Sequence, residues 1–353
     1  MSVPKLRQRG VTLIELMISI TLGLIVLLAV TTVFVNASQT RNELEKSNRQ
    51  VQTGRAAAEI LSNNLRMAAY LGEFDPTPLT TSALAGLPDI CATSISDLLS
   101  AMPLHVQGIN NIDVSGAVPA CLGSDVKPGT DVIVVRRAST CVAGAADCAA
   151  FLDGAPHIQV SLCQSPTELG FSPTSNADYA AHYFTMASAA GAFPLHKADC
   201  TTLADVRRYL VDIYFIANNN DPGDGVPTLK RAELGAGGFS IVPLIDGVEN
   251  MQIDYGLDTD GDGLADVYAA DPSSYGGCTG NACVTNWRNA VSARIALLAR
   301  NPQASGGYTD TRTYTLGIEA DGSTKTVGPF NDGYKRHVYS QTVQLTNPAW
   351  RRQ

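Results

Sequence analysis

The chain contains one long apolar stretch near its N-terminus, from Val11 to Val35. Almost every residue in it is apolar, Gly, Ser or Thr, and Glu15 is its one charged residue. An α-helix needs roughly 20 apolar residues to cross a bilayer, so the stretch predicts a single membrane-spanning helix. Lysine and arginine side chains precede it, which predicts that residues 1–10 stay in the cytoplasm and that the rest of the chain faces outward.

A carboxylate inside an apolar helix needs an explanation. It costs about 2.5–3.5 kcal/mol at the centre of a membrane helix and indicates a function with a nearby partner. Glu15 lies near the start of the stretch, where this cost is lower. Cleavage of the chain between Gly10 and Val11 would create a new α-amino group four residues before Glu15. That amine, on a neighbouring copy of the chain, could neutralise the carboxylate.

This pattern resembles the class III signal of type IV pilins. In that family a short basic leader ends in Gly, and an apolar helix with Glu at its fifth position follows the cleavage site. Gly10 and Glu15 match the family, whereas Val11 stands where Phe is usual. The resemblance implies that a prepilin peptidase cleaves after Gly10 and that the new amine of Val11 is methylated.

Two simpler interpretations compete with this one. The first is a secretory signal peptide cleaved after Ala37, where small residues occupy the required positions. The apolar core of such a peptide spans only about 7–15 residues and holds no acid. The second is a membrane anchor that is never cleaved. Gly10 before the apolar stretch and Glu15 inside it argue against both.

The remainder of the chain is acidic and only moderately charged. Of the 353 residues, roughly 280 follow the helix, enough for one large or two small domains with cores of their own. The net charge of −8 argues against nucleic acid or anionic lipid as the main partner of this part. Charged residues make up only 16% of the sequence, which favours a secreted, β-rich domain with long loops.

All eight cysteines follow the apolar stretch, which predicts an oxidising compartment and disulfide bonds. Local spacing favours Cys141–Cys148 and Cys278–Cys283, each of which closes a small loop rich in Gly and Ala. Sequential pairing would add Cys91–Cys121 and Cys163–Cys200. The CxxC and Cys/His spacings of zinc sites are missing from the sequence.

The helix is expected to continue beyond residues 11–35 as an amphipathic extension, residues 36–72. Apolar residues recur there at intervals of three, four or seven and form a narrow stripe: Leu44, Val51, Ala58, Leu61, Leu65 and Ala68. No proline interrupts residues 11–71, so the helix should be continuous over about 60 residues and end at Gly72. The C-terminal half of the stripe is expected to pack on the following domain, whereas the apolar half needs lipid or like helices to cover it.

Beyond the helix we expect a domain of residues 73–353 with an antiparallel β-sheet, because short β-branched or alternating runs recur there. The predicted strands are residues 132–137, 157–163, 207–217, 228–231, 240–244, 248–255, 291–300 and 336–345. The last two are also compatible with short helices. Residues 73–125 and 164–204 are expected to be long loops tethered by disulfides. The predicted fold class is therefore α+β, with the long N-terminal helix packed on one sheet.

An acidic loop at residues 258–266 is the most specific chemical motif in the chain. It places acidic side chains at positions 1, 3, 5 and 9 and a backbone carbonyl at position 7, as in the first part of an EF-hand calcium loop. The expected ligands are Asp258, Asp260, Asp262, the Leu264 carbonyl and Asp266. Position 12 is Ala269 rather than a bidentate Glu, and Asp271 is a candidate substitute. We expect weak calcium binding; the alternative is an acidic turn without an ion.

Sequence motifs of enzymes are missing. The chain has no P-loop, no HExxH, no GxSxG and no GxGxxG after a strand. Its five histidines are scattered, and none lies at catalytic spacing from a Cys or Asp. A structural or binding role is therefore expected rather than an enzymatic one.

Four further segments resemble PilW-type minor pilins of type IV pili: Leu65–Gly72, Pro128–Arg137, Val248–Gly256 with the acidic loop after it, and Asn331–Arg336. The resemblance implies a pilin-like fold, residence in the inner membrane and the pilus, and a C-terminal domain in the periplasm. It also implies a role in priming pilus assembly near the tip. The implied partners are other minor pilins and the major pilin, contacted through the N-terminal helix, together with prepilin peptidase and a candidate tip adhesin.

Two alternatives stay open at this point. One is a J-type minor pseudopilin of type II secretion, which shares the leader, the long helix and a similar fold. The other is a calcium-dependent adhesin module at the pilus tip, which the acidic loop and the insertion at residues 73–125 would permit.

Overall fold

The structure is a computed structural model, and it describes residues 10–76, 86–116, 118–163, 165–169 and 183–352. The expected leader, apart from Gly10, lies outside the described residues, as do parts of the two expected loops. The chain divides into two compact units, Met1–Arg49 and Gln50–Gln353, and each is considered by itself.

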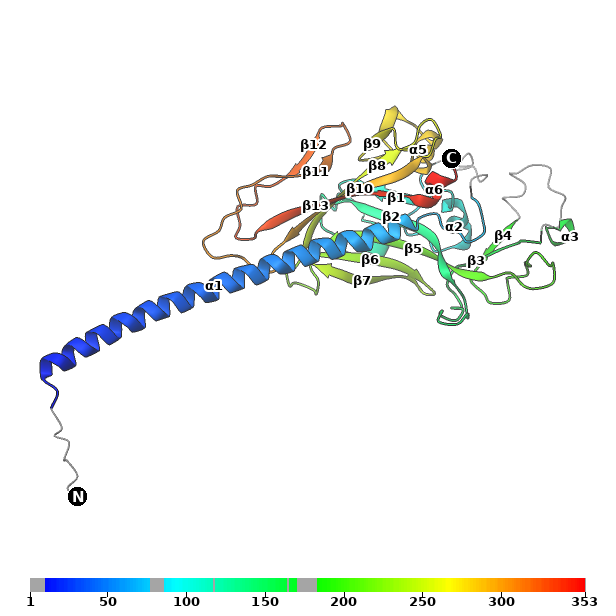
Figure 1. Cartoon of the computed structure of the whole chain (residues 1–353). Coiled ribbons are helices and arrows are strands. Elements are labelled where there is room, and N and C mark those ends of the chain that lie inside the picture. Colours follow the sequence, from blue (N-terminus) through cyan, green and yellow to red (C-terminus); the bar gives the residue numbers. More distant parts are fainter. Residues whose placement is uncertain (1–9, 77–85, 117, 164, 170–182, 353) are drawn as a thin grey trace, which may run out of the picture. The chain divides into compact units, whose positions relative to one another are not determined.

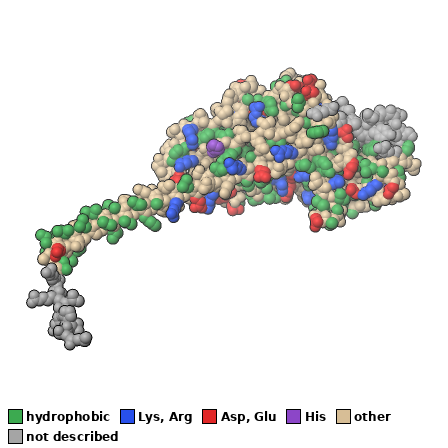
Figure 2. All heavy atoms as spheres, viewed as in Figure 1, with side chains coloured by type: hydrophobic (Ala, Val, Ile, Leu, Met, Phe, Trp, Pro, Cys, Tyr) green, Lys and Arg blue, Asp and Glu red, His purple; other side chains and the backbone are tan. Residues whose placement is uncertain are grey.

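The long N-terminal helix, α1, spans Leu13–Arg66 (Figure 1). Within the described residues it is the one helix long and apolar enough to span a membrane. The large apolar side chains of its first half are exposed, Phe34 at 72% for example, and Figure 2 shows them along this segment. The helix ends earlier than predicted because Ala69 takes a left-handed φ of 60°, which a right-handed helix cannot continue.

Within the second unit, α1 buries one face. Gly54, Ala57, Leu61 and Leu65 lie on that face and are buried. The expected packing of the C-terminal half of the stripe is thus confirmed, whereas Leu44, at the other end of the stripe, is 60% exposed. The apolar periodicity did not single out Gly54, which matters because it lets the helix approach the sheet beneath it closely.

Seven strands form the first sheet (Figure 1), and they pair in the order β1-β2-β5-β3-β4, with β6 joining β5 and β7 joining β6. The strands are β1 (Val106–Ile109), β2 (Val132–Val142), β3 (His157–Val160), β4 (Phe184–Ala187), β5 (Val206–Ala217), β6 (Thr228–Gly235) and β7 (Gly238–Asp246). Every pairing is antiparallel.

A second antiparallel sheet has four strands in the order β13-β10-β8-β9, and a separate hairpin joins β11 to β12. Their bounds are β8 (Val248–Leu257), β9 (Val267–Ala269), β10 (Ala290–Arg300), β11 (Tyr314–Ile318), β12 (Thr324–Val327) and β13 (Arg336–Gln344). The short helices are α2 (Ile95–Ala101), α3 (Pro166–Leu169), α5 (Asn281–Arg288) and α6 (Thr346–Trp350), with 3-10 turns at Ala120–Leu122 and Tyr275–Gly277.

The α+β class with antiparallel pairing is confirmed, but the single predicted sheet is wrong. The chain changes sheets between β7 and β8, which only Gly247 separates. Gly247 has a φ of 82°, and a Cβ there would lie 3.3 Å from the Arg300 carbonyl oxygen, so this abrupt change of direction requires glycine. The residues predicted as strands or short helices at 291–300 and 336–345 form strands β10 and β13.

The main core lies between the two sheets and the C-terminal part of α1. Leu61 and Leu65 from the helix meet Tyr214 from β5, Ile253 from β8 and Trp287 from α5 in this cluster. Each buried side chain of this size contributes about 1.5–3 kcal/mol, so the second unit depends on helix, sheets and α5 together.

A second core covers the opposite face of the first sheet. Val134 and Ile213 on that face contact Phe74, Leu98 and their neighbours from the segment between α1 and β2. The sequence analysis predicted that residues 73–125 are a long surface loop. Their described part instead covers the face of the first sheet that carries Val134 and Ile213. The short apolar pieces in this segment lack a period because α2 and β1 are only seven and four residues long.

The structure contains four disulfide bonds: Cys91–Cys121, Cys141–Cys148, Cys163–Cys200 and Cys278–Cys283. These are the two bonds that local spacing favours and the two of the sequential arrangement. Cys283 lies in α5, a helix that the sequence analysis did not predict.

Gly54 gives a first prediction. A Cβ at this position would lie 2.1 Å from a ring carbon of Tyr339 on β13. We expect Gly54→Ala to destabilise the chain by about 1–3 kcal/mol through overpacking. In a Tyr339→Ala background the same change should instead stabilise by up to about 1 kcal/mol, because alanine favours the helix. Denaturant unfolding of the four chains measures this coupling, and equal effects in both backgrounds would contradict the close approach.

His105 gives a second prediction, about pH. Its Nε2 donates to the Ala290 carbonyl oxygen at 2.6 Å. Burial lowers the pKa of His105 to about 3, although this hydrogen bond opposes the shift; the nearby charges of Arg352 and Arg351 add to it. The unfolded chain binds a proton here near pH 6.5, and the folded chain does so only near pH 3. The contribution to stability is therefore complete above pH 6.5 and is lost as the pH falls.

For this group alone, the free energy of unfolding should fall by up to about 1.4 kcal/mol per pH unit below pH 6.5. His105→Gln keeps a donor for Ala290 and does not titrate. Its denaturant unfolding should therefore show a smaller pH slope than the wild type between pH 4 and 6.5. Identical slopes for the two chains would mean that His105 titrates normally in the fold.

Candidate functional site

The N-terminal segment carries the residues expected to act in processing and assembly. Gly10 and Val11 are exposed and precede the helix, so the peptide bond between them lies outside α1. A glycine before this bond leaves the backbone open to close approach. Within the described residues nothing packs within 4 Å of where a Cβ on Gly10 would lie.

Glu15 lies in the first turn of α1 and caps it. Its Oε2 accepts hydrogen bonds from the Thr12 backbone nitrogen at 3.1 Å and the Thr12 hydroxyl at 3.0 Å. Thr12 Oγ1 in turn lies 3.4 Å from the Glu15 nitrogen. This is a capping box, which satisfies N–H groups that the first helical turn leaves without partners. The spacing Thr-x-x-Glu was visible in the sequence, but its capping role was missed.

The two hydrogen bonds that hold the Glu15 carboxylate use the same oxygen. Oε2 accepts both, and within the described residues Oε1 accepts none. The side chain is also exposed. Glu15 can therefore cap its own helix and still offer a carboxylate oxygen to a cation on another molecule.

The acidic loop brings three of its five predicted ligands together. Carboxylate oxygens of Asp258, Asp260 and Asp262 lie within 4.8 Å of one another. Gly261 and Gly263 both have positive φ, and their N–H groups donate to Asp258 at 2.6 and 3.0 Å. The chain thus turns back on Asp258, which is the buried residue of the three.

Asp266, a further predicted ligand, is engaged elsewhere. Asp266 Oδ2 accepts 2.7 Å bonds from the Thr259 nitrogen and hydroxyl, which lower the pKa of Asp266. Leu264 is exposed, and its N–H donates to Asp262. Asp271 accepts from the Ser273 nitrogen rather than joining the cluster. Of the four predicted carboxylates, the geometry therefore places three around one volume, without Asp266.

A positive charge already lies beside this loop. Arg352 Nη1 donates to Asp258 Oδ2 at 3.2 Å, from 94 residues along the chain. Burial opposes ionisation of Asp258, but the N–H groups of Gly261 and Gly263 and the Arg352 charge together lower its pKa. Asp258 is thus held as a carboxylate, and a bound cation would share it with Arg352.

A buried ion cluster joins two of the segments that resemble PilW. The Arg336 guanidinium, fully buried at the start of β13, makes a bidentate contact with Glu249 on β8. It also donates to Asp310 at 3.0 Å and to Asp332 at 2.6 Å. The ring of Phe330 stacks on it, with its centroid 3.8 Å from the guanidinium carbon. The cluster holds the segment that carries the β11–β12 hairpin against the second sheet.

A third segment that resembles PilW, residues 128–137, contacts β8 as well. The carboxylate of Asp131 accepts from the Ile253 nitrogen on β8 at 2.7 Å and from the Asn111 nitrogen at 2.8 Å. Asp131 also donates its own N–H to Met251. Residues 128–137 therefore couple the first sheet to the second through hydrogen bonds as well as through the apolar core.

The Arg336 cluster gives a third prediction. Arg336→Met should destabilise the chain by about 3–5 kcal/mol, because it removes the one fully buried cation that donates to both Glu249 and Asp310. The longer pairs of Glu249 with Lys127 at 3.5 Å and with Arg300 at 3.7 Å replace it only in part. Arg312→Met is the matched control: Arg312 also pairs with Asp310, at 3.5 Å, but its side chain is 58% exposed. An exposed pair contributes about 1 kcal/mol or less. Thermal melting of the two variants tests the difference, and equal losses would contradict the buried role of Arg336.

Comparison with known proteins agrees with these observations. Residues 213–347, which run from β5 to α6 and include the acidic loop and the Arg336 cluster, match the family model of type IV pilus-assembly protein W. Residues 5–31 match the prokaryotic N-terminal methylation motif. Neither the comparison with curated proteins nor that with solved structures gave a match. Each match covers less than half of the chain; with its apolar helix and its antiparallel β-sheets, the chain is similar to a PilW-type pilin.

Proposed function

We propose that the protein is a minor pilin that primes the assembly of type IV pili and is incorporated near the tip. Prepilin peptidase removes residues 1–10, and the new amine of Val11 is methylated. Before assembly α1 crosses the inner membrane once, and residues 73–353 lie in the periplasm. The role is structural rather than catalytic. Its partners are other minor pilins and the major pilin, and a tip adhesin is a further candidate.

The exposed apolar surface of α1 between residues 11 and 35 is the observation that carries this proposal. Large apolar side chains along it are exposed in the isolated chain, and soluble proteins do not leave a surface of this size uncovered. Lipid covers it before assembly, and the equivalent helices of other pilins cover it in the filament. The match to an N-terminal methylation motif supports a filament rather than a permanent membrane anchor.

Glu15 supplies the electrostatic part of the proposal. Its Oε1 is available while Oε2 caps the helix. The methylated amine of a neighbouring subunit is a cation of suitable size for that oxygen, and pairing the two charges costs less than burying either one alone. The match to pilus-assembly protein W favours a pilus over the J-type pseudopilin of type II secretion.

Two substitutions separate the capping and the pairing roles of Glu15, and they give a fourth prediction. Glu15→Gln keeps a capping box, since Gln also serves at this position, but removes the charge. Thr12→Ala removes the cap and keeps the charge. We expect both chains to be cleaved and to stay in the membrane. Glu15→Gln should enter sheared pili at a small fraction of the wild-type level, and Thr12→Ala at nearly the wild-type level.

Immunoblots of the membrane and of sheared pili measure this, with Glu45→Gln as a control that removes a carboxylate from the exposed surface of the same helix. If Glu15→Gln enters pili at the wild-type level, Glu15 does not act by pairing with a neighbouring amine. A Thr12→Ala defect as large as that of Glu15→Gln would assign the effect to the cap alone.

As a second candidate we propose that the acidic loop binds Ca²⁺ weakly and that the domain serves as a calcium-dependent adhesin module at the tip. The three convergent carboxylates favour this, because such groups repel one another unless a cation lies among them. Water would complete the 6–8 oxygen ligands that Ca²⁺ prefers, and an incomplete protein ligand set suggests a Kd of roughly 10⁻⁴–10⁻³ M.

Calcium binding gives a fifth prediction. At ten times Kd, calcium should stabilise the folded chain by about 1.4 kcal/mol, seen as a higher melting temperature than in chelator. Asp260→Asn together with Asp262→Asn should abolish this difference. Asp221→Asn, in a separate acidic turn, should retain it. If the wild type melts identically in millimolar calcium and in chelator, the loop is an acidic turn that Arg352 alone neutralises.

A further inference from the structure

Strand β13 is an edge of the second sheet, and it lacks the features that protect such an edge. It pairs with β10 over its nine residues without a bulge and, within the described residues, has no strand on its other side. It contains no proline, and no charged side chain lies between Val338 and Gln344. Natural proteins keep edge strands short or place Pro, Lys or a bulge in them, because an open edge pairs with other chains.

The other edge strands that the structure describes are protected in these ways. β1, β4 and β9 are only three or four residues long, and β12 is equally short and carries Lys325. β11 is five residues long, and a bulge interrupts its pairing before Gly317. β7 is as long as β13, but it contains Pro243, which has no N–H to donate. β13 is therefore the one long and regular edge in the described part of the chain.

The hydrogen-bond register fixes which backbone groups of β13 point outward. The N–H of Leu345, the next residue after the strand, donates to the Val291 carbonyl oxygen on β10, so the odd-numbered residues bond to β10. In an antiparallel pair the alternate residues point the other way. The N–H and C=O groups of Val338, Ser340 and Thr342 therefore point away from β10, and no partner for them occurs among the described residues.

A groove of about 350 Å³ lies along this edge. Three consecutive residues of β13, Tyr339, Ser340 and Gln341, line it, so the groove follows the edge of the strand rather than one of its faces. The other wall is the C-terminal part of α1, which runs beside β13 (Figure 1): Gly54 lies against Tyr339, and Ser62 donates to Gln341 at 2.9 Å. A strand added to β13 would therefore lie beside α1.

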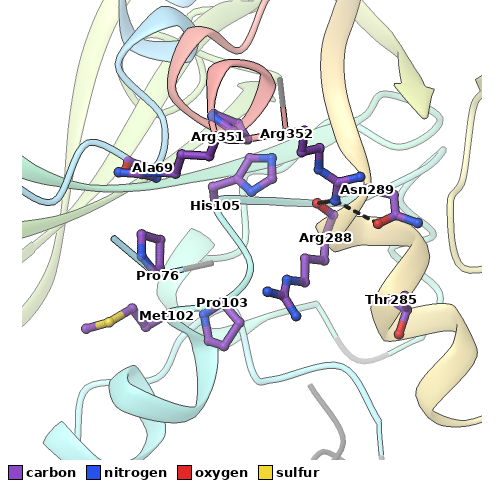
Figure 3. Close-up of a pocket in the computed structure, with 11 residues that line it drawn as sticks. Ala69, Pro76, Met102, Pro103, His105, Thr285, Arg288, Asn289, Arg351 and Arg352 are labelled. Carbon is purple, nitrogen blue, oxygen red and sulfur yellow. Dashed lines mark hydrogen bonds between the residues drawn. The ribbon is translucent and has the colours of Figure 1, made fainter. Parts of the chain in front are cut away.

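The α1 wall of the groove carries charges that the fold does not use. Arg55, Glu59 and Arg66 line the groove and are exposed, and their side chains have no hydrogen bond or ion pair within the described residues. By contrast, Arg351 and Arg352 in the cavity beside α5 and α6 (Figure 3) donate to backbone carbonyl oxygens of the fold. The charges on the wall of the groove are therefore available to a partner.

The spacing of these charges indicates which strand fits the groove. Arg55 and Arg66 are separated by about three helical turns, or about 16 Å along the helix, and Glu59 lies between them. Residues i and i+4 of a strand share a face and lie about 13 Å apart, a difference that two long arginine side chains can bridge. Acidic side chains at i and i+4 would meet the two arginines, whereas Glu59 would repel a third acid at i+2.

We propose that β13 accepts an extended segment of another protein, which adds a strand to the second sheet and carries acidic residues at positions i and i+4. Main-chain groups of this segment pair with Val338, Ser340 and Thr342, and its two carboxylates lie against Arg55 and Arg66. Strand addition of this kind takes its affinity from main-chain hydrogen bonds and its specificity from alternate side chains. The surface uses neither Glu15 nor the apolar half of α1, so it does not depend on the function proposed above.

The test is a fluorescence anisotropy titration of the full chain in non-ionic detergent, with the dye-labelled peptide Ac-Thr-Glu-Val-Asn-Val-Glu-Thr-amide. This peptide should bind saturably below about 1 mM. The same peptide with Lys in place of both Glu should bind about tenfold more weakly, as expected for the loss of two exposed ion pairs. Arg55→Glu together with Arg66→Glu should reverse this preference, and the fold should tolerate both changes because neither side chain has a partner in the described chain.

Two substitutions at one position test the main-chain pairing. Ser340→Pro removes an outward N–H, which an edge strand tolerates, whereas Ser340→Ala keeps it. Binding of the acidic peptide should fall at least about tenfold in Ser340→Pro and stay unchanged in Ser340→Ala, and melting temperatures show whether both chains are folded.

Two methylated peptides make the same test on the wild-type chain. Methylation of the backbone nitrogens of both Val residues blocks one edge of the added strand, and methylation of those of Asn and the second Glu blocks the other. Only one of these two peptides should lose binding. No saturable binding of the acidic peptide, equal binding of the acidic and Lys peptides, or the same response to both methylation patterns would overturn the proposal, as would undiminished binding to a folded Ser340→Pro chain.

Discussion

Strands β2 and β5 are apolar on both faces, and the packing of the second unit depends on this property. Ile133 and Tyr214 point to one face, whereas Val134 and Ile213 point to the other, so two separate covers are needed. The C-terminal part of α1 and the four-stranded sheet form the first cover. The segment between α1 and β2, fastened by a disulfide, forms the second. Helix, sheets and intervening segment therefore stabilise one another, and none of them has a complete core alone.

The strands themselves could be predicted from the sequence, but their division into sheets could not. A β-branched or alternating run defines a strand whichever partner it has, so β5 and β8 were placed within one or two residues. Partner choice depends on which apolar faces meet after the chain turns, and at Gly247 a single residue carries the chain from one sheet to the other. The cover over β2 was missed for a related reason, because it consists of isolated apolar residues such as Phe74 and Leu98, without a period.

The same limit applies to the acidic loop and its surroundings. The spacing of Asp258, Asp260 and Asp262 is local, so their convergence could be predicted. Arg352 is far away in sequence, and its contact with Asp258 exists only because α6 returns the C-terminal end of the chain to α5. A cation in the loop would compete with Arg352 for Asp258.

Glu15 shows how one carboxylate can meet two requirements. A helix that begins in an apolar environment must satisfy its first N–H groups without help from water, and Thr12 with Glu15 does so locally. That arrangement leaves the charge itself uncompensated, since the capping donors are neutral groups. Cleavage after Gly10 would place a cation on each mature chain, so one proteolytic event would both expose the start of the helix and supply the charge that the neighbouring Glu15 needs. A carboxylate that only capped could be replaced by an amide; one that also recruits a neighbour could not.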